Sequence, residues 1–206
     1  MNIDPAEHSS ASNYKLLTNL VIPRPIAWVT SLSANGEVNL APFSFFNAVG
    51  SEPLIIMISV AHRDDGTLKD TGRNILAHGE FVVNLVTEDL MAAMNVSAAD
   101  FPSHESELTA TGLTAAPSCC IKPPRVAEAP VSMECRLHST QDFATYTVFF
   151  GEVVMFHVAD TLLTDRRRIQ GFAPVGRLGS PASYCRTDDR FELPRRSYAE
   201  WKDSPG

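Results

Sequence analysis

The sequence is short of the signals that mark secreted and metal-binding proteins. Its four cysteines stand at positions 119, 120, 135 and 185, without a CxxC pair. This spacing fits neither a zinc site nor the disulfide framework of a small secreted domain. No group of histidines, cysteines and carboxylates has the spacing of a metal site either. We therefore expect no metal, reduced thiols and a cytoplasmic location, where disulfides rarely persist.

Long apolar segments and an excess of positive charge are also missing. The longest apolar runs, such as residues 54–61, are too short to span a bilayer. The first residues, MNIDPAEHSSASNYK, have neither the basic start nor the apolar core of a signal peptide. The formal net charge of -7 argues against a nucleic-acid partner, because phosphate backbones favour a basic surface. We expect a protein that binds small molecules, and neither nucleic acid nor a membrane.

Strand signals recur along the chain and predict its fold class. No GxGxxG follows the first of them, which disfavours a Rossmann domain. Several strands with helices in the long connections predict a mainly β, antiparallel barrel with a few inserted helices. We expect one domain over 1–206, with the barrel at about 14–186 and a polar tail at 187–206. The predicted strands are 26–31, 38–41, 54–60, 81–86, 131–138 and 146–158, and the predicted helices are 14–20, 67–78 and 88–93.

Local residues predict where these elements turn and end. Asn35 and Gly36 favour a tight hairpin turn, and Pro42 must lie at an edge or bulge because it cannot donate to a central ladder. Gly79 is expected to end the helix 67–78, and Gly151 to mark a bulge or bend. Strand 131–138 alternates, with Ser132, Glu134, Arg136 and His138 on a polar side. Residues 1–13 and the tail are expected to be frayed or surface-bound, and 165–168 to form a charged turn or short helix.

Three polar segments between the apolar runs are candidates for a binding site. We expect them to present hydroxyl, amide and backbone groups to a flat ligand. A simpler interpretation remains for each: strand or turn residues, a helix cap at Asp70, a solvated charge at Lys69, or a salt bridge at Arg177. The candidates are Thr30, Ser31, Asn39, Ala41, Pro42 and Ser44, then Ser59, Lys69, Asp70, Thr71 and Asn74, and finally Arg177.

Four stretches together resemble the flavin reductase-like family over roughly residues 14–184. They are PRPIAWVTSLSANGEVNLAPFSFFN, TLKDTGRNI, FFGEVVMFHV and VGRLGSPASY, in this order. The resemblance implies an FMN-binding, Greek-key split barrel that pairs as a homodimer. It also implies an oxidoreductase that takes a hydride from NADH or NADPH onto bound FMN, or FAD, and passes electrons to free flavin, oxygen or a partner protein such as a monooxygenase. No acid or base is needed for such chemistry, so we name no catalytic residue.

The residue types fit the parts of FMN. Ala41 and Pro42 allow backbone groups to approach a planar ring, and hydroxyl and amide side chains suit the ring edge and the ribityl chain. Lys69 and Thr71 stand where a helix is expected to begin, where backbone N–H groups and the helix dipole favour a phosphate. Arg177 offers a forked guanidinium for the phosphate or the pyrimidine edge of the flavin.

One departure from the family pattern leaves the activity open. Many of these reductases carry a Gly-Asp-His run before the strand that ends in Gly-Glu-Val. This chain has residues 142–146, DFATY, so that Tyr146 stands in place of the histidine. A flavin-binding electron carrier or storage protein is therefore the alternative function, and a small-ligand barrel without flavin is a third.

Overall fold

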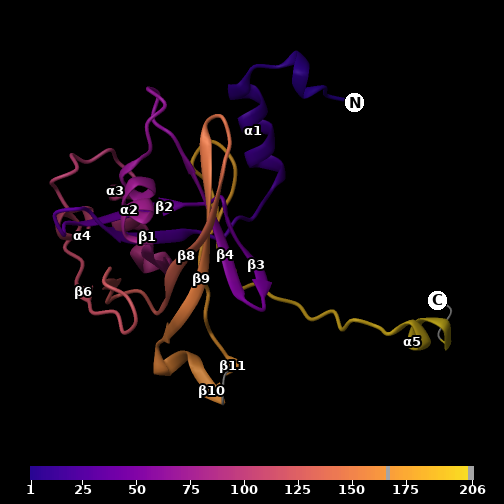
Figure 1. Cartoon of the computed structure of the whole chain (residues 1–206). Coiled ribbons are helices and arrows are strands. Elements are labelled where there is room, and N and C mark those ends of the chain that lie inside the picture. The colour runs from indigo at the N-terminus through magenta and orange to yellow at the C-terminus, as the bar shows by residue number, and fades with distance from the viewer. Residues whose placement is uncertain (166–167, 204–206) are drawn as a thin grey trace.

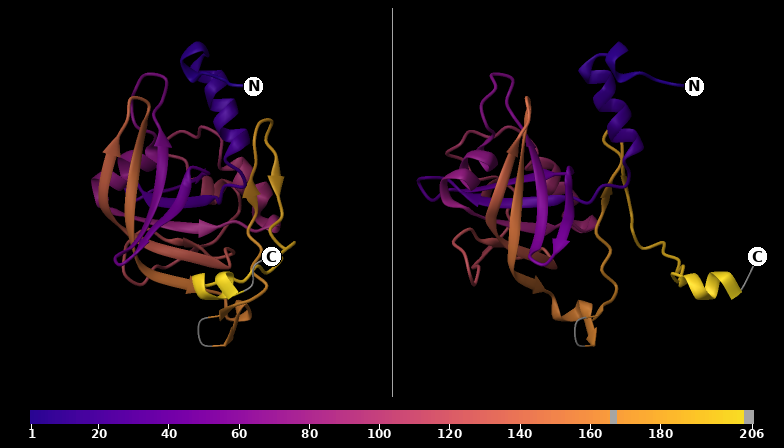
Figure 2. Two further views of the ribbon diagram at one scale, coloured as in Figure 1. Left: turned by 90° about the vertical axis from the view of Figure 1, so that its right-hand side faces the viewer. Right: turned by 45° about the vertical axis from the view of Figure 1, so that its right-hand side comes forward.

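A seven-stranded antiparallel sheet forms the centre of the molecule (Figure 1). The structure is a computed structural model that describes residues 1–165 and 168–203. The sheet curls into a barrel whose edge strands, β2 and β3, do not pair with each other (Figure 2), and this opening splits the barrel. In spatial order its strands are β2 (Val38–Phe43), β1 (Ala27–Leu32), β5 (Glu80–Leu85), β8 (Val131–Asp142), β9 (Tyr146–Val158), β4 (Leu54–Ala61) and β3 (Phe46–Ser51).

Short helices and small two-stranded sheets lie in the connections between the strands of the large sheet. This arrangement confirms the predicted fold class, a mainly β, antiparallel barrel with a few inserted helices. In Figure 1, α2, α3 and α4 lie near β1 and β2 on the left, and α1 lies on the right. Ile75 of α2 belongs to the apolar cluster inside the barrel, whereas Met94 of α3 and Leu108 of α4 belong to the cluster on the opposite face. No helix in the described ranges is long and apolar enough to cross a membrane. The helices are α1 (Ser10–Leu20), α2 (Asp70–His78), α3 (Met91–Val96), α4 (Glu107–Ala110) and α5 (Tyr198–Asp203). The short strands are β6 (Ala115–Ala116), β7 (Arg125–Val126), β10 (Leu163–Asp165), β11 (Arg168–Ile169), β12 (Gly176–Arg177) and β13 (Tyr184–Cys185).

Two apolar clusters cover the two faces of the sheet, and β1 contributes to both. Ala27 and Val29 belong to the cluster inside the barrel, which includes Phe81 and Phe149. Trp28 belongs to the other cluster and donates from Nε1 to Ser97 Oγ at 2.8 Å. Because successive side chains of a strand point to opposite faces, a strand buried on both sides has a nearly continuous apolar sequence.

Several local predictions are confirmed. Gly36 has φ +83° in the turn between β1 and β2, which an L side chain rarely adopts. Pro42 lies in β2, which is an edge strand of the sheet. Gly79 ends α2 in the left-handed conformation, with φ +68°.

Other boundaries differ from the prediction. α1 begins at Ser10 because Ser9 caps it by accepting from the Ser12 N–H, so part of the segment predicted to fray is helical. α2 begins at Asp70 because residues before it form a turn, in which the Thr67 N–H donates to Asp65. Strand β3 was not predicted, because its sequence FNAVGS lacks an alternating pattern.

Gly151 was predicted to mark a bulge or bend, and a register shift does lie beside it. Gly151 pairs with Ile56 of β4 and Leu137 of β8, and the shift falls between Leu137 and Ser139, so the extra residue is on β8 and not on β9. A Cβ on Gly151 would lie 2.4 Å from Phe81 Cζ. The glycine is required by the close approach of that ring.

The predicted polar side of β8 is only partly exposed. Arg136 and His138 are exposed, but Ser132 and Glu134 are fully buried. The segment between β6 and β7 covers them, because its Cys119 and Cys120 N–H groups donate to the Glu134 carboxylate.

The C-terminal tail leaves the barrel as an extended arm that ends in α5 (Figure 2). Phe191 and Leu193 are exposed on it, at 89% and 87%, and so is Trp201. The predicted charged turn at 165–168 includes residues 166–167, which lie outside the described residues, and its flanks form the pair β10–β11.

Candidate functional site

A groove runs between β2, the start of α2 and the end of β4. It consists of two hollows, of about 90 and 210 Å³, that share Pro42, Phe43 and Lys69. The first hollow adds Asn39, Ala41, Asp70 and Thr71 from the predicted set, and the second adds Ser44 and Ser59. Residues that are far apart in the sequence thus form one surface.

The beginning of α2 gives one end of the groove a positive character. Lys69 is the N-cap residue and makes no side-chain cap, so the first-turn N–H groups receive no such partner. Arg63 donates to the Leu68 carbonyl at 2.6 Å and to Asp70 at 2.7 Å, and Arg73 also pairs with Asp70. Cations and the helix N-terminus together suit a phosphate.

Arg63 was missed by the sequence analysis. The simpler interpretation of Asp70 as a helix cap was wrong, because Lys69 is the N-cap residue, and Asp70 is the first helical residue and binds two arginines. The HRDD run after β4 was the only available signal for Arg63, because an arginine beside aspartates predicts an ion pair without placing it.

Four of the predicted residues form two hydrogen-bonded pairs with one another. Asn39 donates to Thr71 Oγ1 at 2.9 Å, and both line the groove. Asn74 donates to Ser31 Oγ at 3.1 Å, and both side chains are buried where α2 packs on β1. Asn74 lines a smaller adjoining hollow with Asn39 and Asp70, whereas Ser31 lines none of these hollows.

Thr30 and Arg177 lie apart from the groove. Thr30 is fully buried on the other face of β1 and donates to the Pro124 carbonyl at 2.5 Å. Arg177 lies on the β12–β13 hairpin, with its guanidinium 4.8 Å from the centre of the Tyr184 ring. Its Nη1 is buried and has no hydrogen-bond partner among the described residues. Neither residue lines either hollow of the groove.

Aromatic side chains form the other end of the groove. Tyr146, which pairs with Ala61 across β9 and β4, stacks on Phe45 with ring centres 5.9 Å apart. Tyr14 of α1 lies next to Phe45, at 6.4 Å between ring centres. Burial, and secondarily Tyr14, raises the pKa of Tyr146. The phenol is therefore protonated at neutral pH and can donate a hydrogen bond.

Arg24 is a buried cation that positions Ser44. It donates to the carbonyls of Thr18, Val21 and Leu178 at 2.6, 2.7 and 2.9 Å, and to Ser44 Oγ at 3.4 Å. Burial lowers the pKa of Arg24, and nearby Arg177 lowers it further. Sequence reasoning missed this role because the prolines on either side of Arg24 indicated only the end of the preceding helix.

Glu107 of α4 is a second residue that the sequence did not reveal. Its carboxylate is 7% exposed, lines the groove and accepts from the Leu40 N–H at 2.9 Å. Burial raises its pKa, with a smaller contribution from Asp70, and this outweighs the hydrogen bond from Leu40. A carboxyl group with a raised pKa in a pocket is a candidate for binding or proton exchange.

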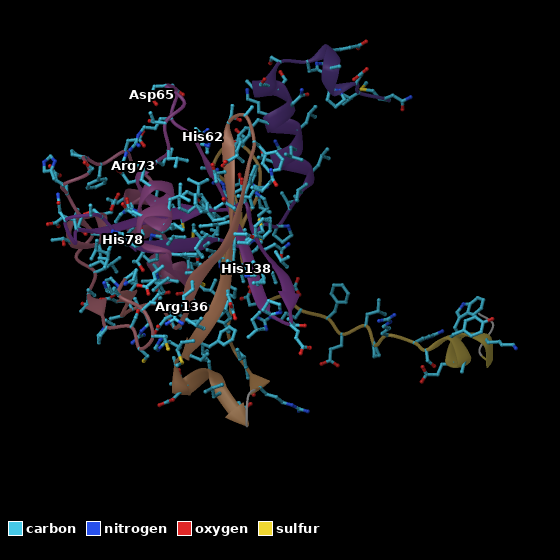
Figure 3. All side chains as sticks on the ribbon, in the orientation of Figure 1. His62, Asp65, Arg73, His78, Arg136 and His138 are labelled. Carbon is cyan, nitrogen blue, oxygen red and sulfur yellow. The ribbon has the colours of Figure 1, made fainter. Side chains whose placement is uncertain are left out.

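The histidines contribute less to this groove. Figure 3 shows His62 near the loop that follows β4, and Arg73 on α2. His62 Nε2 lies 2.9 Å from Thr147 Oγ1, which in turn donates to Asp142. His62 lines neither hollow, so these contacts support a structural role.

The split antiparallel barrel, with a groove that is cationic at one end and aromatic at the other, is the mainly β architecture that the sequence motifs implied. The family model of the flavin reductase like domain matches residues 19–173. The chain therefore belongs to the flavin reductase-like family, as the sequence motifs predicted.

Solved structures agree with this assignment. Nitrilotriacetate monooxygenase component B from Bacillus cereus is 40% identical, with a TM-score of 0.88, over 94% of this chain and 98% of that one. The 2-nitrobenzoate 2-nitroreductase NbaA from Pseudomonas fluorescens is 38% identical, with a TM-score of 0.87, over 96% and 98%. A flavin reductase with a split barrel domain from Shewanella frigidimarina is 20% identical, with a TM-score of 0.80, over 95% and 100%, and supports the fold alone.

Proposed function

We propose that this protein is an FMN-dependent oxidoreductase that binds the cofactor in the groove. The observation that carries the proposal is the polarity of this surface. Arg63, Lys69 and the N-terminus of α2 lie at one end, and Tyr146 stacked on Phe45 lies at the other. An amphipathic ligand with a phosphate and a flat ring matches both ends. FAD, with its additional nucleotide, is the second option.

Individual residues have distinct roles in this proposal. Lys69 and the backbone N–H groups of Asp70 and Thr71 would hold the phosphate. Asn39 and Thr71, which are hydrogen-bonded to each other, would instead form hydrogen bonds with the ribityl hydroxyls. Ala41 and Pro42 would let the β2 backbone approach the ring, and Ser44 and Ser59 line the wall beside it.

The flavin, when bound, supplies hydride and electron transfer, and the protein positions it. NADH or NADPH is the proposed reductant, and free flavin, oxygen or a partner protein the acceptor. The similarity to a protein named as a monooxygenase component supports a partner monooxygenase. Tyr146 would donate a hydrogen bond near the ring, where many family members have a histidine.

We further propose a homodimer. Each hollow of the groove is smaller than the roughly 300–1,000 Å³ typical of ligand pockets. A larger apolar hollow, of about 470 Å³, opens beside it and is lined by Leu17, Val21, Met57 and Phe150, among others. A second subunit covering this face would complete the groove. Arg177, whose Nη1 has no hydrogen-bond partner among the described residues, is the residue that we expect to contact the second subunit.

A flavin-binding electron carrier is the second candidate function. The observation that favours it is Tyr146 at the aromatic end of the groove, because a phenol does not carry the positive charge that histidine can. This alternative keeps the same groove and cofactor.

The absorbance spectrum of the purified protein tests these proposals. We expect a yellow protein that releases FMN on denaturation, and an apoprotein that takes up one FMN per chain. Mixing the loaded protein with NADH or NADPH under argon should bleach the flavin absorbance. Binding without bleaching by either nucleotide would establish the carrier, and a colourless protein that takes up neither FMN nor FAD would overturn flavin binding altogether.

A further inference from the structure

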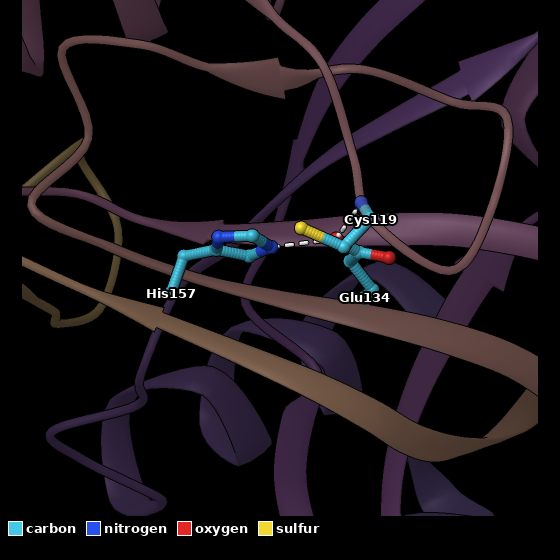
Figure 4. Close-up of side chains that lie close together, drawn as sticks. All are labelled: Cys119, Glu134 and His157. Carbon is cyan, nitrogen blue, oxygen red and sulfur yellow. Dashed lines mark hydrogen bonds and ion pairs between the residues drawn. The ribbon is translucent and has the colours of Figure 1, made fainter.

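Three metal-ligating side chains meet on the sheet face opposite the barrel interior, outside the groove. Cys119, Glu134 and His157 each bring one donor atom, and these atoms lie within 4.8 Å of one another (Figure 4). The sequence spacing predicted no metal site, because the three residues come from a loop and two different strands. None of them lines either hollow of the groove.

The sheet register places two of these side chains together. His157 of β9 pairs with Ser132 of β8, and Glu134 lies two residues further along β8 on the same face. Diagonal neighbours of this kind are within reach of long side chains. Glu134 is fully buried, and His157 Nε2 lies 2.5 Å from its Oε1.

Backbone contacts hold the third residue over this pair. The N–H groups of Cys119 and Cys120 donate to the two Glu134 oxygens at 2.6 and 2.7 Å. Arg136 donates to the Cys120 carbonyl, and the Lys122 N–H donates to Glu80, both at 3.0 Å. The loop 117–124 is thus fixed to the sheet by its backbone, independently of the Cys119 thiol.

The hydrogen bonds from Cys119 N–H, Cys120 N–H and His157 stabilise the buried Glu134 carboxylate, but none of them involves the Cys119 thiol. Cys119 Sγ makes no hydrogen bond among the described residues, although it lies beside a carboxylate and an imidazole. Thiolate, carboxylate and neutral imidazole are all ligands of zinc, and two anionic ligands balance a divalent cation. Cys119 is exposed, so a cation can reach the site from solvent.

We propose that Cys119, Glu134 and His157 bind one divalent cation of the zinc class, with water as a fourth ligand. Zinc bonds of about 2.0–2.3 Å place tetrahedral ligand atoms about 3.3–3.8 Å apart. His157 Nε2 and Glu134 Oε1, which lie 2.5 Å apart as a hydrogen-bonded pair, therefore separate when the cation enters. The cation takes the place of the Nε2 proton between His157 and Glu134. That proton moves to Nδ1, so the imidazole stays neutral, and the thiol proton is released to solvent. The bound metal clamps the loop 117–124 onto β8 and β9.

Cobalt binding to the chelator-stripped, full-length protein tests the site. We expect one Co²⁺ per chain, with thiolate charge-transfer absorbance and the visible bands of a tetrahedral ion. Cys119→Ser should abolish the charge-transfer band and weaken binding at least tenfold. The neighbouring Cys120→Ser and the distant Cys185→Ser are the matched controls and should change the affinity by less than twofold.

Zinc titration followed by thermal unfolding provides a second measurement. Zn²⁺ should raise the Tm of the wild-type protein but leave that of Cys119→Ser unchanged, and FMN affinity should be the same in both proteins. Absence of stoichiometric Co²⁺ binding by the wild type would overturn the proposal. An equal loss in the Cys119 and Cys120 variants would also overturn it, since it would place the thiolate ligand elsewhere.

Discussion

Two polar regions of this protein use similar residues for different purposes. Beneath the loop 117–124 and β7, Thr30, Asn84 and Ser132 are fully buried and each is hydrogen-bonded within the chain. In the groove, Lys69 is partly exposed, and its ion pair with Asp100 is long, at 3.6 Å. The comparison shows that a hydrogen-bonded polar residue that lines no hollow has a structural role, whereas a polar residue that lines the groove is a candidate for ligand binding even where it has a partner in the chain.

The largest effect is expected in the buried region. Asn84 donates to the Trp28 carbonyl and accepts from the Val126 N–H and Ser132 Oγ, at 3.0, 3.0 and 2.9 Å. Asn84→Ala leaves these groups without partners and should lower the free energy of unfolding by about 3 kcal/mol. Urea denaturation measures it, with the exposed Asn95→Ala as the control. A loss below about 1 kcal/mol would show that the network relaxes or hydrates.

Substitutions in the groove should change the affinity for the ligand and leave the free energy of unfolding almost unchanged. Lys69→Ala should weaken FMN binding by about 1–3 kcal/mol, because a charge-assisted contact to the phosphate is lost. Its unfolding free energy should change by less than about 0.5 kcal/mol. Fluorescence titration with FMN measures the affinity, and Lys122→Ala, outside the groove, is the control. Equal affinities in both variants would move the phosphate away from α2.

Thr30 sharpens the comparison because the sequence placed it among the ligand residues. Thr30→Val keeps the shape but removes the hydrogen bond to the Pro124 carbonyl, so stability should fall by about 1 kcal/mol. We expect FMN affinity to be unchanged, since Thr30 lies on the face of β1 turned away from the groove. The exposed Thr140→Val on β8 is the matched control for unfolding. A weaker FMN affinity in Thr30→Val would show that the two regions are coupled.

Glu107 has features of both regions, because it is buried and hydrogen-bonded within the chain but also lines the groove. Its raised pKa means that the folded state holds a proton more tightly than the unfolded chain does. Its contribution to stability is therefore greatest below the ordinary glutamate pKa and falls as pH rises toward the raised value.

Glu107→Gln removes the cost of the buried charge and keeps an acceptor for the Leu40 N–H. It should stabilise the fold by about 0.5–1 kcal/mol at pH 7, and the gain should vanish below about pH 4, where both states are protonated. Denaturation across this pH range measures it, with the exposed Glu37→Gln as the control for a lost charge. A gain that persists at low pH would mean that packing, and not ionisation, is responsible.

The sequence alone determined many of the strands and helices and the positions where they turn or end. Asn35–Gly36, Pro42 and Gly79 each restrict the backbone at their own position, so the turn, the edge strand and the end of α2 followed from short-range sterics. The continuous apolar run of β4 and the long run of β9 likewise indicated buried strands. The family motifs then identified the flavin reductase-like fold.

The tertiary structure alone decided which polar side chains can contact a ligand. Strand register brought Glu134 to His157, loop packing buried Thr30, and the turn before α2 carried Arg63 to the groove. These contacts join residues that are distant in the chain, and the same serine, threonine or carboxylate occurs in both settings. The sequence shows which groups a polar side chain can bind. Packing determines whether that side chain faces another group of the protein or a hollow that a ligand can enter.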